Sequence, residues 1–531
     1  MARKQRETVL ASYAKDLDAA RARGLAGIEK WLDWSIDNGL SGNTVDLYRT
    51  VVHAYPGRVW PEKLKNAYAA PTPPGTDKAS LSGCQTRRDN ALQGYGIELM
   101  SLVRACASVR MYDKAYELLQ EILRVSPDDR NARNYLGYLP VIDPDTHQRL
   151  WLWKADAAHV SRGEVWIGDI GWVPRNQADR YRKGEYLDGG KWIALAEANR
   201  RHADADNPWV IAGPHFILRT TLEHADALDL SVALEEYYRT VYKDFLGFFA
   251  QDNRALNAMF DSGVATTPLV VNFFATKDQY DNCVRTKMAK ARNVELLIKS
   301  GGFYSHATGE SYFYKTPSRQ VDLQVAFHET THQILGEFIR ETKTTARVAE
   351  MPAVYMEYVR WQNGRILTPP WALSDFLRAM RLDKEVMTVA AYTALTEDQF
   401  QCSDESARLL HYAMAGGLAD FLMNADNGVY RQGFMEFCRD SYKKGEIPPL
   451  NEYLGLNAAD LEAGWKSYRE KNFVGIMGRI KALARQWREQ HPQQEPGTEF
   501  SPVTSAPTSP NETAKPGTSH PIATASSYVT E

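Results

Sequence analysis

The chain has few cysteines, little net charge and no long apolar run, and each shortage excludes a class of protein. Its five cysteines are scattered over 531 residues without a Cys-x-x-Cys pair, so neither a disulfide framework nor a cysteine zinc site is indicated. A formal net charge of −3 without a long basic stretch gives no reason to expect a nucleic-acid partner. No apolar run of about 18 residues is present, which argues against a membrane span.

The first residues, MARKQRETVLASYAKDLDAARARG, are charged and helical in pattern. They lack the apolar core of a secretory signal peptide. A chain with neither a signal peptide nor a membrane span is expected in the cytoplasm by default. If an N-terminal segment has been trimmed, the expected location is instead periplasmic or extracellular, so the localisation stays open.

What is present predicts an α+β protein with several parts. The length and the hydrophobic fraction of 44% are sufficient for more than one packed core. We expect a helical region over residues 1–145, a mixed region with strands and an edge hairpin over 146–320, a helical lobe over 321–489, and a disordered Pro/Ser/Thr-rich tail over 490–531.

One segment of the helical region resembles a tetratricopeptide helix pair. In GIELMSLVRACASVRMYDKAYELLQEILRVSPDDRNARNYLGYL, the small, apolar and terminating positions of that repeat are occupied by Leu102, Ala115, Leu119 and Pro127. An ordinary helical hairpin explains the same pattern, because only one good repeat is visible and stable stacks usually need about three. A protein partner bound through these N-terminal helices is what the resemblance implies.

Short runs of β-branched and aromatic residues follow. GEVWIGDIGWV, PWVIAGPHFILRTT and TPLVVNFFAT predict strands, and residues 225–249 between the last two predict a helix. GGFYSHATGESYFYK predicts a hairpin, with strands near Phe303 and Tyr312 and a turn at Thr308-Gly309. The mixed region therefore alternates strands with helices.

The run VAFHETTHQIL combines a helical pattern with the spacing of a metal site. In an expected helix from Val321 to Ile339, His328 and His332 lie one turn apart on one side, so both imidazoles can reach one ion. Glu329 lies about 100° around the helix, where it can accept a proton from a water at the ion. Histidines satisfied within the helix and a solvated glutamate are the alternative, and a third ligand is needed to decide.

Glu350 is the best-placed candidate for that third ligand. The metzincin continuation is excluded, because it requires glycine and histidine where this chain has Leu335 and Phe338. Glu350, in RVAEMPAVYMEYVRW, follows at a spacing that lets the first helix end and a second helix turn back. Glu357 lies two turns further on the same face and suits a hydrogen bond to a ligand better than direct ligation. A surface glutamate is the alternative for both.

The pattern His328-Glu329-x-x-His332 followed by Glu350 resembles the gluzincin metallopeptidases, in which two helices carry His, His and Glu. The segments VAFHETTHQIL, EMPAVYMEY, GGFYS...SYFY and HYAMAGGLADFLM are similar to an uncharacterised bacterial family of gluzincin-like metallopeptidases, over about residues 150–470. This resemblance implies a zincin-like domain with a small mixed sheet, an edge hairpin, an active-site helix and a mainly helical C-terminal lobe.

The resemblance also implies roles for individual residues. Zn2+ would be bound by His328, His332 and Glu350, and Glu329 would act as general base and proton shuttle. Tyr412, in HYAMAGG, matches the tyrosine that in gluzincin aminopeptidases donates a hydrogen bond to the oxyanion. A tyrosine that only packs within a helix is the alternative. The substrate implied is a peptide or protein segment, held extended against the SYFY edge.

The sequence departs from the pattern in two places. The GGFYS segment lacks the glutamate with which gluzincin aminopeptidases bind a substrate amino terminus, so we expect no aminopeptidase activity. Met351-Pro352 stands where the family usually has glycine after the ligand. Because proline is accepted in the first helical turn and restricts the preceding residue to extended conformations, we expect the second helix to begin at Pro352, with Glu350 just before it.

The leading hypothesis is therefore a zinc-dependent metallopeptidase of the gluzincin type. The alternative is a non-catalytic helical-repeat interaction protein with a degenerate zincin-like domain. The tetratricopeptide-like segment, the Pro/Ser/Thr-rich tail and the Met-Pro departure favour this alternative. The distances among the side chains of His328, His332 and Glu350 distinguish the two hypotheses, since zinc ligands lie within bonding distance of one ion.

Overall fold

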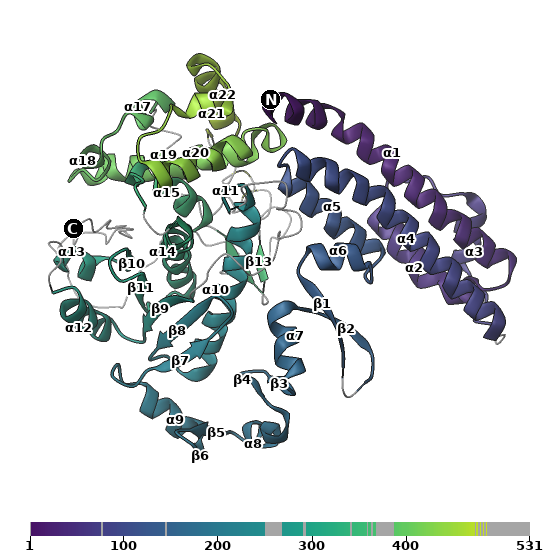
Figure 1. The fold of residues 1–531 in the computed structure, drawn as a ribbon, viewed down its shortest axis with the longest axis horizontal. Coiled ribbons are helices and arrows are strands. Elements are labelled where there is room, and N and C mark those ends of the chain that lie inside the picture. The colour runs from purple at the N-terminus through teal and green to yellow at the C-terminus, as the bar shows by residue number, and fades with distance from the viewer. Residues whose placement is uncertain are drawn as a thin grey trace. The chain divides into compact units, whose positions relative to one another are not determined.

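The computed structural model describes residues 2–475 except 76–77, 144–145, 250–267, 290–293, 340–341, 358, 363–364, 368–386 and 473, and also describes residues 478, 482 and 485. The fold is α+β, mainly helical with small sheets (Figure 1). Segment 490–531, predicted as a disordered tail, lies outside the described residues.

The chain forms two compact units. The first comprises Met1–Arg201, Ala212–Phe216 and Glu223–Pro268, and the second comprises His202–Ile211, Ile217–Leu222 and Leu269–Glu531. This division follows contacts within the chain. The four regions predicted from composition stay a prediction.

The first unit begins with packed helices. Helix α4 packs against both α1 and α5, and Figure 1 shows the three side by side. Leu102, Ala115 and Leu119 are buried, as expected for the predicted helix pair, whereas its likeness to a tetratricopeptide repeat stays a prediction. The helices are α1 (Ala2–Asp37), α2 (Ser41–Ala54), α3 (Glu62–Ala69), α4 (Lys78–Ser108), α5 (Tyr112–Val125) and α6 (Arg130–Tyr135).

Three hairpin–helix units follow, a repetition that the sequence patterns had not revealed. They are β1 (Tyr138–Ile142), β2 (Arg149–Trp153) and α7 (Lys154–Ser161); β3 (Glu164–Ile167), β4 (Gly171–Pro174), the 3-10 helix η1 (Arg175–Gln177) and α8 (Ala178–Arg182); and β5 (Glu185–Asp188), β6 (Lys191–Ala194) and α9 (Leu195–His202). The predicted GEVWIGDIGWV strands are β3 and β4. The predicted helix over 225–249 is also present, as α10 (His224–Asp244) and α11 (Leu246–Phe249).

One backbone hydrogen bond recurs in all three hairpin–helix units. The residue after the second strand donates its N–H to the carbonyl of the glycine before the first strand. These bonds run from Lys154 to Gly137 at 3.2 Å, from Arg175 to Gly163 at 3.1 Å, and from Leu195 to Gly184 at 2.8 Å. All three glycines have positive φ, a conformation that glycine adopts without the steric cost paid by other residues. The units therefore share a closing contact as well as an order of elements.

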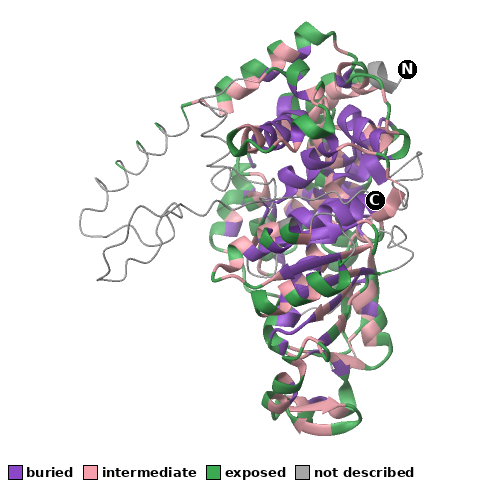
Figure 2. Ribbon diagram, turned by 90° about the vertical axis from the view of Figure 1, so that its left-hand side faces the viewer, coloured by how far each residue is buried: buried purple, intermediate pink, exposed green. Residues whose placement is uncertain are grey.

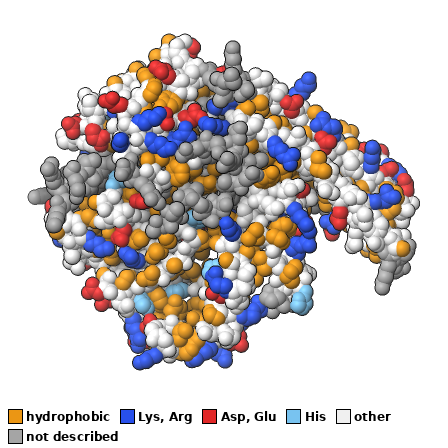
Figure 3. Space-filling model, viewed as in Figure 1, with side chains coloured by type: hydrophobic (Ala, Val, Ile, Leu, Met, Phe, Trp, Pro, Cys, Tyr) orange, Lys and Arg blue, Asp and Glu red, His pale blue; other side chains and the backbone are white. Residues whose placement is uncertain are grey.

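The hairpins and the core differ in burial. The hairpins of the hairpin–helix units are mostly half-buried or exposed, whereas buried residues gather in the helices and in the larger sheet (Figure 2). On the face drawn in Figure 3, lysine and arginine are interspersed with aspartate and glutamate. Within the described residues, no helix is both long and apolar enough to cross a membrane.

The second unit contains a five-stranded sheet in the order β10-β11-β9-β8-β7. Its strands are β7 (Trp209–Ala212), β8 (Phe216–Thr220), β9 (Leu269–Phe274), β10 (Gly302–Ser305) and β11 (Glu310–Tyr314). β10 and β11 form the predicted hairpin, and β11 runs parallel to β9. Side chains alternate between the two faces of a strand. Phe303 and Tyr312 accordingly join the core beneath α12 (Lys277–Lys287) and α13 (Val294–Lys299), and helix α14 covers the other face.

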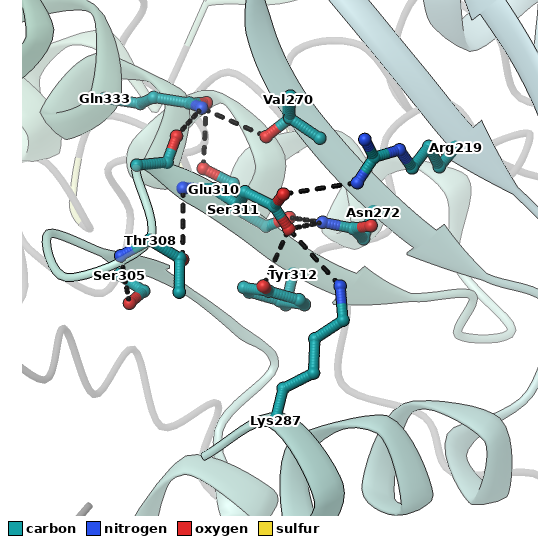
Figure 4. A network of polar contacts seen from close by, with 11 residues as sticks. Arg219, Val270, Asn272, Lys287, Ser305, Thr308, Glu310, Ser311, Tyr312 and Gln333 are labelled. Carbon is teal, nitrogen blue, oxygen red and sulfur yellow. Dashed lines mark hydrogen bonds and ion pairs between the residues drawn. The ribbon is translucent and has the colours of Figure 1, made fainter.

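Glu310 ties the beginning of β11 to the neighbouring strands. Its Oε1 accepts a hydrogen bond from Arg219 of β8 at 3.2 Å. Its Oε2 accepts from Asn272 of β9 at 2.9 Å and from the Tyr312 hydroxyl at 2.8 Å (Figure 4). The partly buried carboxylate is therefore paired with donors from three strands, which fixes the register of the hairpin on the sheet.

Helices complete the second unit. α14 (Arg319–Ile339) and α15 (Ala346–Met356) pack against each other, and α15 also packs against α19. The remaining elements are β12 (Arg360–Gln362), β13 (Arg365–Leu367), α17 (Val389–Thr393), α18 (Glu397–Phe400), α19 (Glu405–Asn424), η3 (Ala425–Gly428), α20 (Arg431–Lys444), α21 (Leu450–Leu454) and α22 (Ala458–Asn472).

Candidate metal centre

Helix α14 is buried on all sides where it carries the His-Glu-x-x-His pattern. Every residue over 326–336 is buried, including the polar ones. Buried polar groups need partners, and the threonines find theirs inside the helix: the hydroxyl of Thr330 donates to the Ala326 carbonyl at 2.7 Å, and that of Thr331 to the Phe327 carbonyl at 2.8 Å. The histidines and Glu329 have their partners in neighbouring elements.

His328, His332 and Glu350 converge on one point. The two Nε2 atoms are 3.2 Å apart, and Glu350 Oε2 lies 3.1 Å from His328 Nε2 and 3.6 Å from His332 Nε2. Ligands bonded at about 2.0–2.1 Å to a tetrahedral ion lie about 3.3 Å from one another. The three side chains are all buried and form a group that could hold a metal ion. The structure thus brings together the three residues predicted as ligands.

The Glu350 carboxylate has the properties of an ion ligand. Its side chain is 0% exposed, and no hydrogen bond from the described residues reaches Oε2. Burial opposes ionisation, but the imidazoles of His332 and His328 hold the pKa of Glu350 below its ordinary value. A buried anionic oxygen without a hydrogen bond is costly, and a cation placed among the three ligand atoms would remove that cost.

The helix that carries Glu350 begins earlier than predicted. α15 starts at Ala346 and includes Pro352, so the predictions that it begins at Pro352 and that Met351 is extended are wrong. The Ala346 N–H is capped by the Glu397 carboxylate of α18 at 2.9 Å, which satisfies a helix-end donor. Packing on α14 and α19 outweighs the local preference of proline, and the helix ends within four residues of it.

Glu357 orients one of the histidines, as its spacing predicted. Its Oε2 lies 2.6 Å from His328 Nδ1, and both side chains are buried. A carboxylate only accepts hydrogen bonds, so Nδ1 carries the proton and donates it. In a neutral ring the lone pair is then on Nε2, which faces the shared point.

Glu329 lies on a different side of α14 from the histidines. Its Oε2 accepts a hydrogen bond from the Tyr304 backbone N–H of β10 at 3.0 Å. Oε1 has no hydrogen bond within the described part of the chain. Burial raises the pKa of Glu329 to about 8. One oxygen is therefore held by the sheet, and the other is available to exchange a proton.

Tyr412 reaches the group, whereas its neighbour His411 does not. The Tyr412 hydroxyl lies 3.5 Å from Glu350 Oε1, a long hydrogen bond, and both side chains are buried. Burial raises the pKa of Tyr412 well above its ordinary value, with Glu350 as a further cause, so the phenol keeps its proton. His411 instead places Nδ1 3.0 Å from the Phe400 carbonyl. The structure therefore places a neutral donor beside the predicted ligands.

The SYFY strand is not the edge of the sheet, which corrects the prediction of where a substrate would lie. β11 pairs with β10 on one side and with β9 on the other, so its backbone groups are already used. The edge is β10, which contains Tyr304. The Tyr304 N–H is turned to Glu329, away from β11. A contact made by a backbone group leaves no signal in the residue types, so the sequence did not predict it.

Comparison of the chain with models of protein families, with curated proteins and with solved structures gives no match. The function is therefore argued from the geometry of the site.

Proposed function

We propose that this protein is a zinc-dependent metallopeptidase of the gluzincin type, with a zincin-like second unit. The observation that carries the proposal is the convergence of His328, His332 and Glu350, with no hydrogen bond to Glu350 Oε2 from the part of the chain that the structure describes. Two imidazoles and one carboxylate are the donor set of catalytic zinc sites, in which three protein ligands leave a position open. His328 Nε2, His332 Nε2 and Glu350 Oε2 would hold the ion.

When bound, zinc supplies a Lewis acid that activates a water as nucleophile near neutral pH and polarises the carbonyl under attack. Glu329 accepts a proton from that water at Oε1 and passes it to the leaving nitrogen, while the Tyr304 N–H keeps Oε2 in place. Tyr412 donates its hydroxyl hydrogen bond to the oxygen on which charge develops. Glu357 holds His328 in the tautomer that ligates.

The substrate class that fits these groups is a peptide or protein segment. Strand β10 ends the sheet next to Glu329, and a sheet edge binds an extended chain through backbone groups. Its four residues, Gly302 to Ser305, include no acidic side chain that would bind a substrate amino terminus. We accordingly propose internal cleavage of peptides and not aminopeptidase activity.

The test compares zinc content and peptide hydrolysis in the wild type, Glu329→Gln and Glu337→Gln. Glu337 is a matched control, because it lies on α14 two turns beyond Glu329 and accepts from the Tyr304 hydroxyl, away from the ligand atoms. We expect about one zinc per chain in all three, and a fall in kcat of about 10²–10⁴-fold on a fluorescence-quenched peptide library in Glu329→Gln, far larger than any change in Glu337→Gln. Equal hydrolysis by the wild type and Glu329→Gln would refute the proposal.

The alternative of a non-catalytic interaction protein has support in the first unit. There a helix array and three hairpin–helix units form structure with no metal-binding group among its described residues. This alternative predicts that chain purified without chelators holds no stoichiometric zinc, and that it hydrolyses no member of the library.

A further inference from the structure

Gln333 follows the second histidine in the sequence but faces the sheet. It lies one helical turn after Glu329, so the two side chains project from the same side of α14, and Glu337 continues this row. The outer two both contact Tyr304: its N–H donates to Glu329 at 3.0 Å, and its hydroxyl donates to Glu337 at 2.8 Å. This side of the helix is therefore joined to the β10–β11 hairpin by hydrogen bonds to two carboxyl groups.

The amide of Gln333 makes three hydrogen bonds to the sheet and to the turn of the hairpin (Figure 4). Its Nε2 donates to the Val270 carbonyl of β9 at 3.0 Å and to the Gly309 carbonyl at 2.8 Å, and its Oε1 accepts from the Ser311 hydroxyl at 2.9 Å. Both N–H groups and the oxygen are thus paired, and the side chain is 0% exposed. Hydrogen bonds so buried are expensive to lose, because no water replaces the missing partner.

These three bonds join α14 to three parts of the sheet. Val270 belongs to the central strand, Gly309 to the turn of the hairpin and Ser311 to β11. The hairpin carries Tyr304, so its position relative to α14 sets where the N–H that binds Glu329 lies. The position of the His328 ring depends on elements other than the hairpin, because its partners Glu357 and Glu350 follow α14 in the chain.

We propose that Gln333 is a positioning residue that holds the β10–β11 hairpin where the Tyr304 N–H orients the Glu329 carboxylate. The inference rests on the proposed function, in which Glu329 transfers the proton. The orientation of Glu329 then depends on Gln333, whereas the affinity of the same helix for zinc does not. A change at Gln333 should therefore reduce turnover in a protein that still binds its metal.

The experiment uses the full chain loaded with zinc and the variants Gln333→Leu, Ser311→Ala and Thr330→Val. Gln333→Leu removes all three bonds. Ser311→Ala removes only the bond to Oε1, so this milder variant still tests the contact if Gln333→Leu fails to fold. Thr330→Val is the matched control, because Thr330 is equally buried on α14 and its hydroxyl bonds only within the helix. The readouts are zinc content, amide hydrogen exchange over residues 302–314, and kcat and KM on a fluorescence-quenched peptide.

We expect exchange over 302–314 to rise about tenfold in Gln333→Leu, less in Ser311→Ala, and not at all in Thr330→Val. Zinc content should stay equal in all of them, while kcat falls about 10- to 100-fold in Gln333→Leu with KM changed less than about twofold. Unchanged exchange in both hairpin variants, or zinc lost in step with kcat, would overturn the positioning role. If the wild type hydrolyses no peptide, the proposed function fails, and the exchange measurement still tests the contact.

Discussion

Two rows of polar side chains on α14 are buried, apart from the half-buried Glu337, but they are paired differently. The ligand row, which comprises the proposed ligands His328 and His332, presents Nε2 atoms to a carboxylate oxygen of Glu350 that has no hydrogen bond among the described residues. The sheet row, Glu329, Gln333 and Glu337, is hydrogen-bonded to the hairpin and to β9. Burial of polar groups occurs in both rows, so burial does not distinguish one row from the other. The difference teaches that an unpaired buried oxygen on which two imidazoles converge indicates a binding site, whereas a fully paired amide indicates a structural role.

Apart from Glu329→Gln, the substitution expected to lower kcat most is at Tyr412, whose hydroxyl lies beside the ligand row. Tyr412→Phe removes a hydroxyl but keeps the ring against Phe400, so we expect zinc to be retained and kcat to fall about 100-fold. Tyr392→Phe is the control, because that buried hydroxyl donates to the Arg347 carbonyl instead. Kinetics together with metal analysis check this. Loss of zinc in Tyr412→Phe would show that the hydroxyl holds Glu350 and not an oxyanion.

A smaller effect should separate the two rows by metal affinity. Glu357→Gln weakens the bond that fixes the His328 tautomer, so we expect the dissociation constant for zinc to rise about 10- to 100-fold. Glu337→Gln alters a carboxylate of the sheet row and should leave that constant unchanged. Competition with a chromophoric chelator measures both. Equal weakening of zinc binding in the two variants would show that the two rows do not differ in their effect on metal affinity.

The smallest effect should be one of stability in the sheet row. Gly309 has a φ of +67°, and a Cβ there would lie 3.0 Å from Glu337 Oε1. We expect Gly309→Ala to lower the free energy of unfolding by about 1 kcal/mol, through backbone strain in the turn, with zinc affinity unchanged. Ala307→Ser, at an exposed position of the same turn, is the control. Denaturant titration checks this, and a variant as stable as the wild type would contradict it.

Elements with a local signal were predictable. The helical spacing of apolar residues predicted the helix over 321–339, and the turn residues predicted the hairpin around Thr308-Gly309. The structure has both. The spacing of Glu350 from the histidines also predicted a side chain that the structure brings to them, because the intervening segment is long enough for a second helix to turn back onto the first. The three hairpin–helix units were missed, although Gly163-Glu164 and Gly184-Glu185 repeat the same pair before a strand.

Predictions failed where packing opposed local preference. Pro352 disfavours a helix around it, yet α15 runs through it because its surroundings bury every residue from Val348 to Met356. The resemblance to gluzincins implied that the SYFY strand is an edge, but the order of strands places it inside the sheet. Gln333 gave no signal of its own, since a glutamine in a helix is ordinary until its partners are known.

By itself, the sequence determined which residues share a side of a helix, because a turn of 3.6 residues follows from backbone geometry alone. That is sufficient to bring His328 and His332 together and to set Glu329 beside them. Only the tertiary structure decided what those side chains face. The Glu350 carboxylate, the Tyr304 N–H and the amide partners of Gln333 come from segments far along the chain. Their approach depends on packing between elements, which no local pattern records.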